Sequence, residues 1–171
     1  GLPEDVAFAI EDHYKPRFAG DELPQGLVGT VVALADKLET LGGMFSIDQV
    51  PSGDKDPYAL RRHALGVLRI GAELLTGQQS NLDQWCHVAL EPFGSDPAKV
   101  SQLYGFFLDR LRGYGTTNGY SSEEVEAVVA NVRPLLLAEF FDRLRAVRSF
   151  KGLPEAPALA AANKRIGNIL K

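Results

Sequence analysis

The sequence predicts an all-α protein, and three observations lead to that prediction. Apolar residues recur at steps of three and four along most of the 171 residues, which is the spacing of one buried helical face. Asp-Pro and Ser-Ser-Glu-Glu steps, which are typical of helix starts, stand before several of these runs. Only residues 28–33 and 45–50 are compatible with a short strand. We therefore expect a multi-helix orthogonal assembly.

The first part of the chain predicts two helices separated by a polar loop. Residues 5–14 show helical spacing, and Pro16 is expected to end that helix because proline has no amide proton to donate. Residues 27–41 carry leucine and valine along one helical face. The pair Gly42-Gly43 is expected to end this second helix.

A surface loop and a third helix are expected next. Residues 46–56 contain proline, glycine and several aspartates with few apolar side chains, which is typical of a surface loop. At Asp56-Pro57 the aspartate can cap free amides, and a proline at the first helical position sacrifices no hydrogen bond. A helix is therefore predicted to begin there and to continue to Thr76 and Gly77.

Five further helices are predicted in the remainder of the chain. They cover, in order, residues 80–90, 96–114, 121–131, 134–150 and 156–170. The second begins at another Asp-Pro step, and the third begins at Ser-Ser-Glu-Glu, where serine and glutamate can form a capping box. The large aromatic and aliphatic residues of the second predict a central packing element. The turn at residues 92–95 is the expected internal boundary.

Charge and hydropathy restrict the class of protein. A formal net charge of -4 argues against a protein that binds nucleic acid over its whole surface, so any RNA contact should be confined to a basic patch. Basic residues concentrate at Arg61, Arg62 and Arg69 and again in residues 143–151. No apolar run approaches the roughly 20 residues of a membrane span, and no export signal opens the sequence. We expect a soluble protein of the cytoplasm.

The residues able to carry catalysis are few. The single cysteine, Cys86, excludes an internal disulfide and is expected to lie in the core. Metal hydrolases of the HD type use a His-Asp dipeptide among their ligands, and this chain has none, although Asp36 stands on a helix as one member of such a set would. His13 follows two acidic residues and could act as a general base, but a polar helix end is the favoured interpretation. We expect neither a catalytic nor a metal centre.

Four segments carry a resemblance to a known family. They are HYKPRFAGDELP at residues 13–24, ALADKLETLGGMF at 33–45, PSGDKDPYALRRHALGVLRI at 51–70 and LAAANKRIGNIL at 159–170. Together they resemble the beta subunit of the bacterial, two-subunit glycyl-tRNA synthetase, and the third segment is the most specific. Residues 110–121 are similar to the family's link into its anticodon-binding region. The resemblance covers almost the whole chain.

The resemblance implies a central-to-C-terminal slice of that subunit. Residues 1–92 would be the C-terminal part of an HD-like helical domain, and residues 93–171 a helical linker and the start of a helical, DALR-like anticodon-binding region. In this family the alpha subunit makes glycyl-adenylate using ATP and Mg²⁺, whereas the beta subunit supplies tRNA recognition. The implied partners are therefore tRNA(Gly) and the alpha subunit. No cofactor in this segment, no DNA and no membrane partner are expected.

Basic side chains on helices are the expected RNA contacts. The candidates are Arg17, Lys55, Arg61, Arg62, Arg69, Lys164 and Arg165. Two alternatives stay open at this point: the pair Arg61-Arg62 could instead form ion pairs with Asp54, Asp56 or Asp36, and Lys164 and Arg165 could belong to a solvated helix face. Three functions are weighed, namely tRNA recognition, a docking scaffold for the alpha subunit and, least favoured, an HD-type metal phosphohydrolase.

Overall fold

The computed structural model of the chain describes residues 3–130 and 134–169 and confirms the all-α prediction. The α-helices are α1 (Glu4–Asp12), α2 (Gly26–Ser46), α3 (Leu60–Glu73), α4 (Leu82–Leu90), α5 (Pro97–Thr117), α6 (Ser122–Val129), α7 (Phe140–Lys151) and α8 (Ala156–Ile169). Short 3₁₀ helices lie at Gly77–Ser80, Glu91–Phe93 and Leu137–Glu139. Within the described residues no strand forms, and residues 28–33 belong to α2. None of the described helices is long and apolar enough to cross a membrane.

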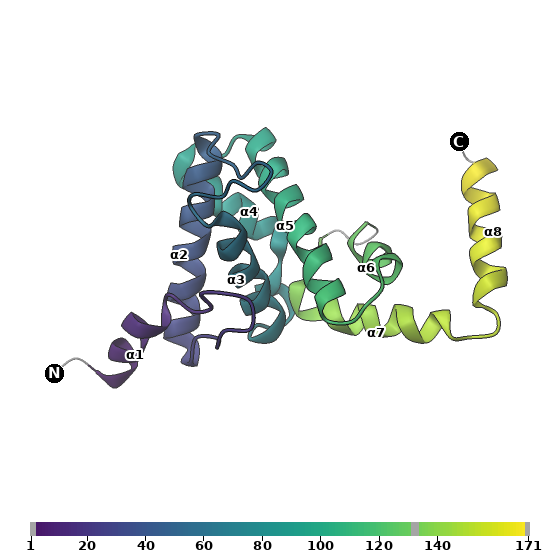
Figure 1. Cartoon of the computed structure of the whole chain (residues 1–171), viewed down its shortest axis with the longest axis horizontal. Coiled ribbons are helices and arrows are strands. Elements are labelled where there is room, and N and C mark those ends of the chain that lie inside the picture. The colour runs from purple at the N-terminus through teal and green to yellow at the C-terminus, as the bar shows by residue number, and fades with distance from the viewer. Residues whose placement is uncertain (1–2, 131–133, 170–171) are drawn as a thin grey trace.

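Four helices form the centre of the molecule, and the others extend from it (Figure 1). α2 packs against both α3 and α4, and α5 lies across α3 and α4 before it reaches α6. α1 lies at one end of α2, whereas α7 leads away from the centre and α8 turns off from it. Because α5 contacts helices before and after residues 92–93, the two expected parts share a core, and the boundary between them stays a prediction.

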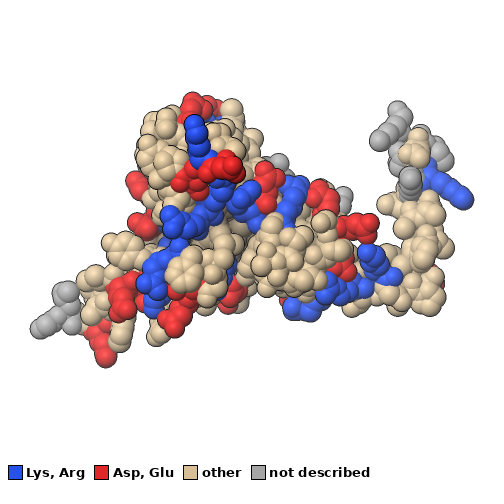
Figure 2. Space-filling view, viewed as in Figure 1, with Lys and Arg blue, Asp and Glu red and all other residues tan. Residues whose placement is uncertain are grey.

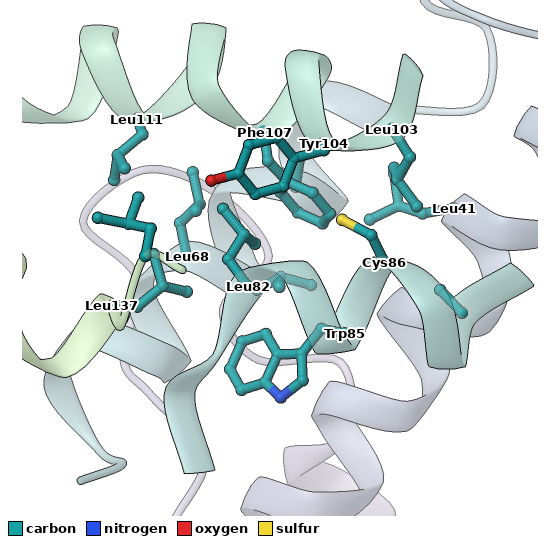
Figure 3. Close-up of a cluster of buried hydrophobic side chains, with 14 of the residues drawn as sticks. Leu41, Leu68, Leu82, Trp85, Cys86, Leu103, Tyr104, Phe107, Leu111 and Leu137 are labelled. Carbon is teal, nitrogen blue, oxygen red and sulfur yellow. The ribbon is translucent and has the colours of Figure 1, made fainter. Parts of the chain in front are cut away.

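The core is built on α5. Figure 3 shows Leu103, Phe107 and Leu111 pointing from α5 toward α4, where Leu82 and Cys86 meet them. All five side chains are fully buried. The prediction that Cys86 packs in the core is thereby confirmed, and α5 is the central packing element that its aromatic residues indicated.

The predicted end of α2 was wrong. The helix continues through Gly42-Gly43 to Ser46. A Cβ atom added at Gly42 would lie 1.9 Å from the carbonyl oxygen of Ala89 in α4. The glycine therefore permits a close approach of two helix backbones and does not terminate the helix.

The two Asp-Pro steps behave differently. At Asp96 the carboxylate accepts a hydrogen bond from the Ala98 amide at 2.9 Å, and α5 begins at the proline as predicted. At Asp56 the predicted start was wrong, because α3 begins only at Leu60. The Asp56 carboxylate still caps the helix, since it accepts hydrogen bonds from the amides of Leu60 at 2.8 Å and Arg61 at 3.0 Å. Both carboxylate oxygens of Asp56 thus accept hydrogen bonds from backbone amides at the start of α3.

Candidate nucleic-acid interface

A groove of about 640 Å³ lies between α3, α5 and the loop at residues 18–20. The side chains that give it its character are four arginines and two aromatic residues: Arg61, Arg62 and Arg69 of α3, Arg110 of α5, Phe18 and Tyr114. We call it the arginine groove. In Figure 2, Lys and Arg side chains form a band across the face of the α2–α5 group. Two carboxylates, Glu73 and Asp109, also line the groove, and they accept hydrogen bonds from Arg69 and Arg112 respectively. With four arginines against these two acids, the groove combines an excess of positive charge with aromatic surface.

Arg69 is a fixed part of the groove wall. Its Nε donates to Glu73 Oε1 at 2.9 Å, and its guanidinium also donates to the carbonyl oxygen of Asp21 at 2.7 Å. The Tyr114 hydroxyl donates to the same Glu73 carboxylate at 2.7 Å. Burial and this carboxylate raise the pKa of Tyr114 well above its usual range, so the phenol stays protonated. The network joins α3 to α5.

The other three arginines of the groove have no carboxylate partner among the described residues. Among the described residues the guanidinium of Arg61 donates to the carbonyl oxygen of Gly53 and to no carboxylate. Arg110 lies over the ring of Phe106, with 5.8 Å from guanidinium carbon to ring centroid, and its buried Nε has no hydrogen-bond partner in the described structure. The alternative that Arg61 and Arg62 form ion pairs with nearby aspartates is not realised in the described structure. Unpaired guanidinium groups are available for an anion.

The remaining candidates lie outside this groove. Arg17 is paired with Asp21, with guanidinium-to-carboxylate distances of 2.9 and 3.1 Å, and this contact holds the pKa of the Asp21 carboxyl well below its usual range. Lys55 lies on an exposed turn at the tip of the loop before α3. Arg165 is exposed on α8, and the side chain of Lys164 lies outside the described residues. The structure therefore brings together three of the seven candidates.

The second basic cluster, in residues 143–151, is internally neutralised. Its ion pairs are Arg143 with Glu139 at 2.7 Å, Arg145 with Asp142, Arg148 with Glu124 at 2.8 Å, and Lys151 with Glu123 at 2.9 Å. Hydrogen bonds from Arg148 lower the pKa of Glu124 to about 2. These basic side chains stabilise the α6–α7 region and contribute less free positive charge than the arginine groove does.

Sequence reasoning missed Arg110, Phe18 and Tyr114. Arg110, Tyr114 and Thr117 stand at helical spacing along one edge of the apolar stripe of α5, and that spacing could have shown that they share a surface. No sequence signal indicated that α3 lies beside this surface.

Two chemical alternatives can be compared with the geometry. His13 caps the end of α1, and its Nδ1 lies 2.7 Å from the carbonyl oxygen of Ile10, which agrees with the helix-end interpretation. In the part of the chain that the structure describes, no three His, Cys, Asp or Glu side chains are close enough together to hold a metal ion. Asp36 has no such cluster around it among those residues.

Comparison with known proteins gives a consistent result. The family model for the glycyl-tRNA synthetase beta subunit matches residues 1–130. Beta subunits of glycine–tRNA ligase from Dechloromonas aromatica, Nitrosomonas europaea and Paracidovorax citrulli are 58%, 54% and 59% identical to the chain, and each alignment covers 100% of it. The alignments cover 24%, 26% and 24% of those relatives, so the chain spans about a quarter of their length. The chain belongs to the glycyl-tRNA synthetase beta subunit family.

Proposed function

We propose that this chain is the part of a glycine–tRNA ligase beta subunit that contacts tRNA(Gly) through the arginine groove during ATP-dependent aminoacylation. The proposed partner is the alpha subunit, which would hold the catalytic centre with its ATP and Mg²⁺. The observation that carries the proposal is the set of three groove arginines, Arg61, Arg62 and Arg110, that lack a carboxylate partner among the described residues.

The chemistry of the groove suits an RNA backbone. Guanidinium groups bind phosphate oxygens in pairs of hydrogen bonds, and aromatic rings such as Phe18 offer a face on which an unpaired base can stack. Phosphate contacts position RNA without reading its sequence, so the isolated chain should bind weakly. Its affinity should fall steeply with salt, since each phosphate contact releases counterions.

A second candidate function is docking of another protein surface. Ile10, Val28 and Val32 are exposed around a shallow hollow between α1 and α2, and Leu27 and Val31 are exposed on the same first turns of α2. Leu27 is 75% exposed. A contiguous apolar patch of this kind is typical of an interaction site, and the alpha subunit or another part of the beta subunit would fit it. For the third function considered, metal-dependent phosphohydrolysis, the described residues form no group of metal-binding side chains.

The test is binding of tRNA(Gly), with an unrelated tRNA beside it, at two salt concentrations. We expect wild-type binding to weaken at the higher salt. The Arg61→Ala/Arg62→Ala variant should bind more weakly, and the slope of log affinity against log salt should fall by about one for each phosphate that the variant no longer binds. Arg143→Ala/Arg145→Ala is the matched control, because both of its arginines already have carboxylate partners on α7 or just before it.

The result separates the two candidate functions. A failure of the wild-type chain to bind tRNA at low salt would refute RNA recognition by this segment. The docking function would then be the better supported one, because an apolar interface depends little on ionic strength.

A further inference from the structure

A second pocket, of about 230 Å³, lies beside the arginine groove and shares Arg62 with it. It is lined by Tyr14, Pro16, Arg17, Lys37, Ala59, Arg62 and His63. No carboxylate is among these lining residues, whereas Lys37 and Arg62 are cationic and His63 contributes an imidazole ring; the third cation, Arg17, is already paired with Asp21. We call it the Lys37 pocket.

Lys37 is the most deeply buried cation of the described chain, with 3% of its surface exposed. Its ammonium group donates to the carbonyl oxygens of His13 at 3.1 Å and Tyr14 at 3.3 Å. An ammonium group has three protons, so one donor remains for another acceptor. Burial lowers the pKa of Lys37, because no described carboxylate forms an ion pair with it and Asp36 acts on it only at longer range.

The backbone of α3 is shaped around this lysine. A Cβ atom added at Gly66 would lie 2.7 Å from Cε and 3.0 Å from Cδ of Lys37. The missing side chain at Gly66 thus leaves the path along which the lysine stem reaches the pocket. A glycine inside a helix and a buried ammonium group each lower the stability of a fold, so packing alone does not explain their combination.

His63 adds an unused polar atom to the same pocket. Its Nδ1 is buried and has no hydrogen-bond partner among the described residues. Burial, followed by the positive charge of Lys37, lowers the pKa of the ring, and Arg62 acts in the same direction. Asp36 and Asp56 oppose this effect at longer range. A ring nitrogen without a partner beside an ammonium and a guanidinium group forms an arrangement that suits an anionic acceptor.

We propose that the Lys37 pocket binds a single phosphate group, which accepts hydrogen bonds from Lys37, Arg62 and His63. The pocket has room for such a group, since one water molecule takes up about 30 Å³ of liquid. The phosphate could be free in solution or belong to an RNA backbone. The second source rests on the proposed function, because Arg62 would then link this phosphate to a strand lying in the arginine groove.

The first experiment uses inorganic phosphate at constant ionic strength and follows the histidine ring signals of the chain by NMR. The sequence has only three histidines, and His63→Gln assigns the signal of interest. Phosphate should shift the His63 signal saturably in the millimolar range and raise the ring's pKa, whereas exposed His87 on α4 should respond little. An unresponsive His63 signal would overturn the proposal.

Two variants test whether the side chains of the pocket bind the phosphate. Arg62→Gln removes an exposed guanidinium that makes no ion pair among the described residues, so its fold should be intact, and Lys37→Met removes the buried charge at similar length. Each should weaken phosphate binding about tenfold or more, the usual effect of losing one charge-assisted hydrogen bond. Arg145→Gln, on α7, is the control. Unchanged phosphate binding in both pocket variants would also overturn the proposal.

Binding of tRNA(Gly) to the same variants identifies the source of the phosphate. Weaker tRNA binding by Lys37→Met, whose side chain does not line the arginine groove, would place an RNA phosphate in the pocket. Unchanged tRNA binding by both pocket variants, together with a phosphate response of the wild-type chain that the variants weaken, would assign the pocket to free phosphate. If wild-type chain binds phosphate but no tRNA, the proposed function fails while the phosphate site stands.

Discussion

Replacing Gly42 by alanine should destabilise the chain, although alanine is the better helix former. The new Cβ atom would lie 1.9 Å from the carbonyl oxygen of Ala89, which is roughly 1 Å too close for any real contact. The Cβ atom is bonded directly to the α2 backbone and the oxygen belongs to the α4 backbone, so no side-chain rotation can relieve the clash and the two helices must separate. That movement would loosen the core between them, where Leu41 and Phe45 are fully buried.

The expected destabilisation follows from two opposing effects. Overpacking a core costs about 1–3 kcal/mol, and more where backbone has to move. The higher helix propensity of alanine returns about 1 kcal/mol. Because the two helix backbones must move apart, the cost lies at about 3 kcal/mol or above, and the net loss in the free energy of unfolding is then about 2 kcal/mol or more. This corresponds to a fall in Tm of about 4–8 °C for a chain of this size.

Urea unfolding followed by circular dichroism and by tryptophan fluorescence measures this destabilisation. Trp85 is the only tryptophan of the sequence and belongs to the core, so its emission reports on the α4 region directly. Gly105→Ala on α5 is the matched control, because no neighbouring atom lies within 4 Å of the added Cβ. This control should be more stable than the wild type by up to about 1 kcal/mol. A Gly42→Ala variant as stable as the wild type would refute the close-approach explanation of the glycine.

Three further predictions concern the core and the polar networks. Phe107→Ala should lower the free energy of unfolding by about 3–5 kcal/mol in the same urea assay, because it leaves a cavity in the centre of the core; a decrease below about 1 kcal/mol would contradict the packing described. Tyr114→Phe should cost about 1 kcal/mol because its hydrogen bond to Glu73 is removed, and no change would show that the bond is not formed in solution. The pKa of Glu124 is lowered from 4.5 to about 2 by Arg148, so its stabilising effect is complete above pH 4.5 and is lost as the pH falls toward 2. Thermal unfolding of wild type and Glu124→Gln should therefore differ at neutral pH and converge near pH 2, and a constant difference would contradict the assignment.

Local sequence signals predicted the features that depend on neighbouring residues. The capping box at Ser121 and Glu124 is confirmed, since each side chain bonds the other's backbone amide within one turn. The continuation of α2 through Gly42 was not predictable in this way. It depends on Ala89, a residue of another helix, and the sequence alone does not show that these two backbones touch.

The same limit applies to the arginine groove. Arg61, Arg62 and Arg69 were found because they stand close together in the sequence of one helix. Arg110 completes the groove from α5, and only the packing of α5 against α3 brings it there. Sequence reasoning also gave equal weight to basic residues such as Arg17, whose pairing with Asp21 is visible only in the folded chain.

The way α8 is attached has a consequence for its dynamics. The helix has 14 residues and is therefore about 21 Å long, yet Ala156 is the only one of its described side chains that is buried. A helix of this length is marginal in water when little packs against it. Its amide protons should exchange with solvent long before those of α5, without unfolding of the core. Protection of these amides would rise only when another surface covers Leu159 and Ile166, so hydrogen exchange along α8 can report the arrival of a partner.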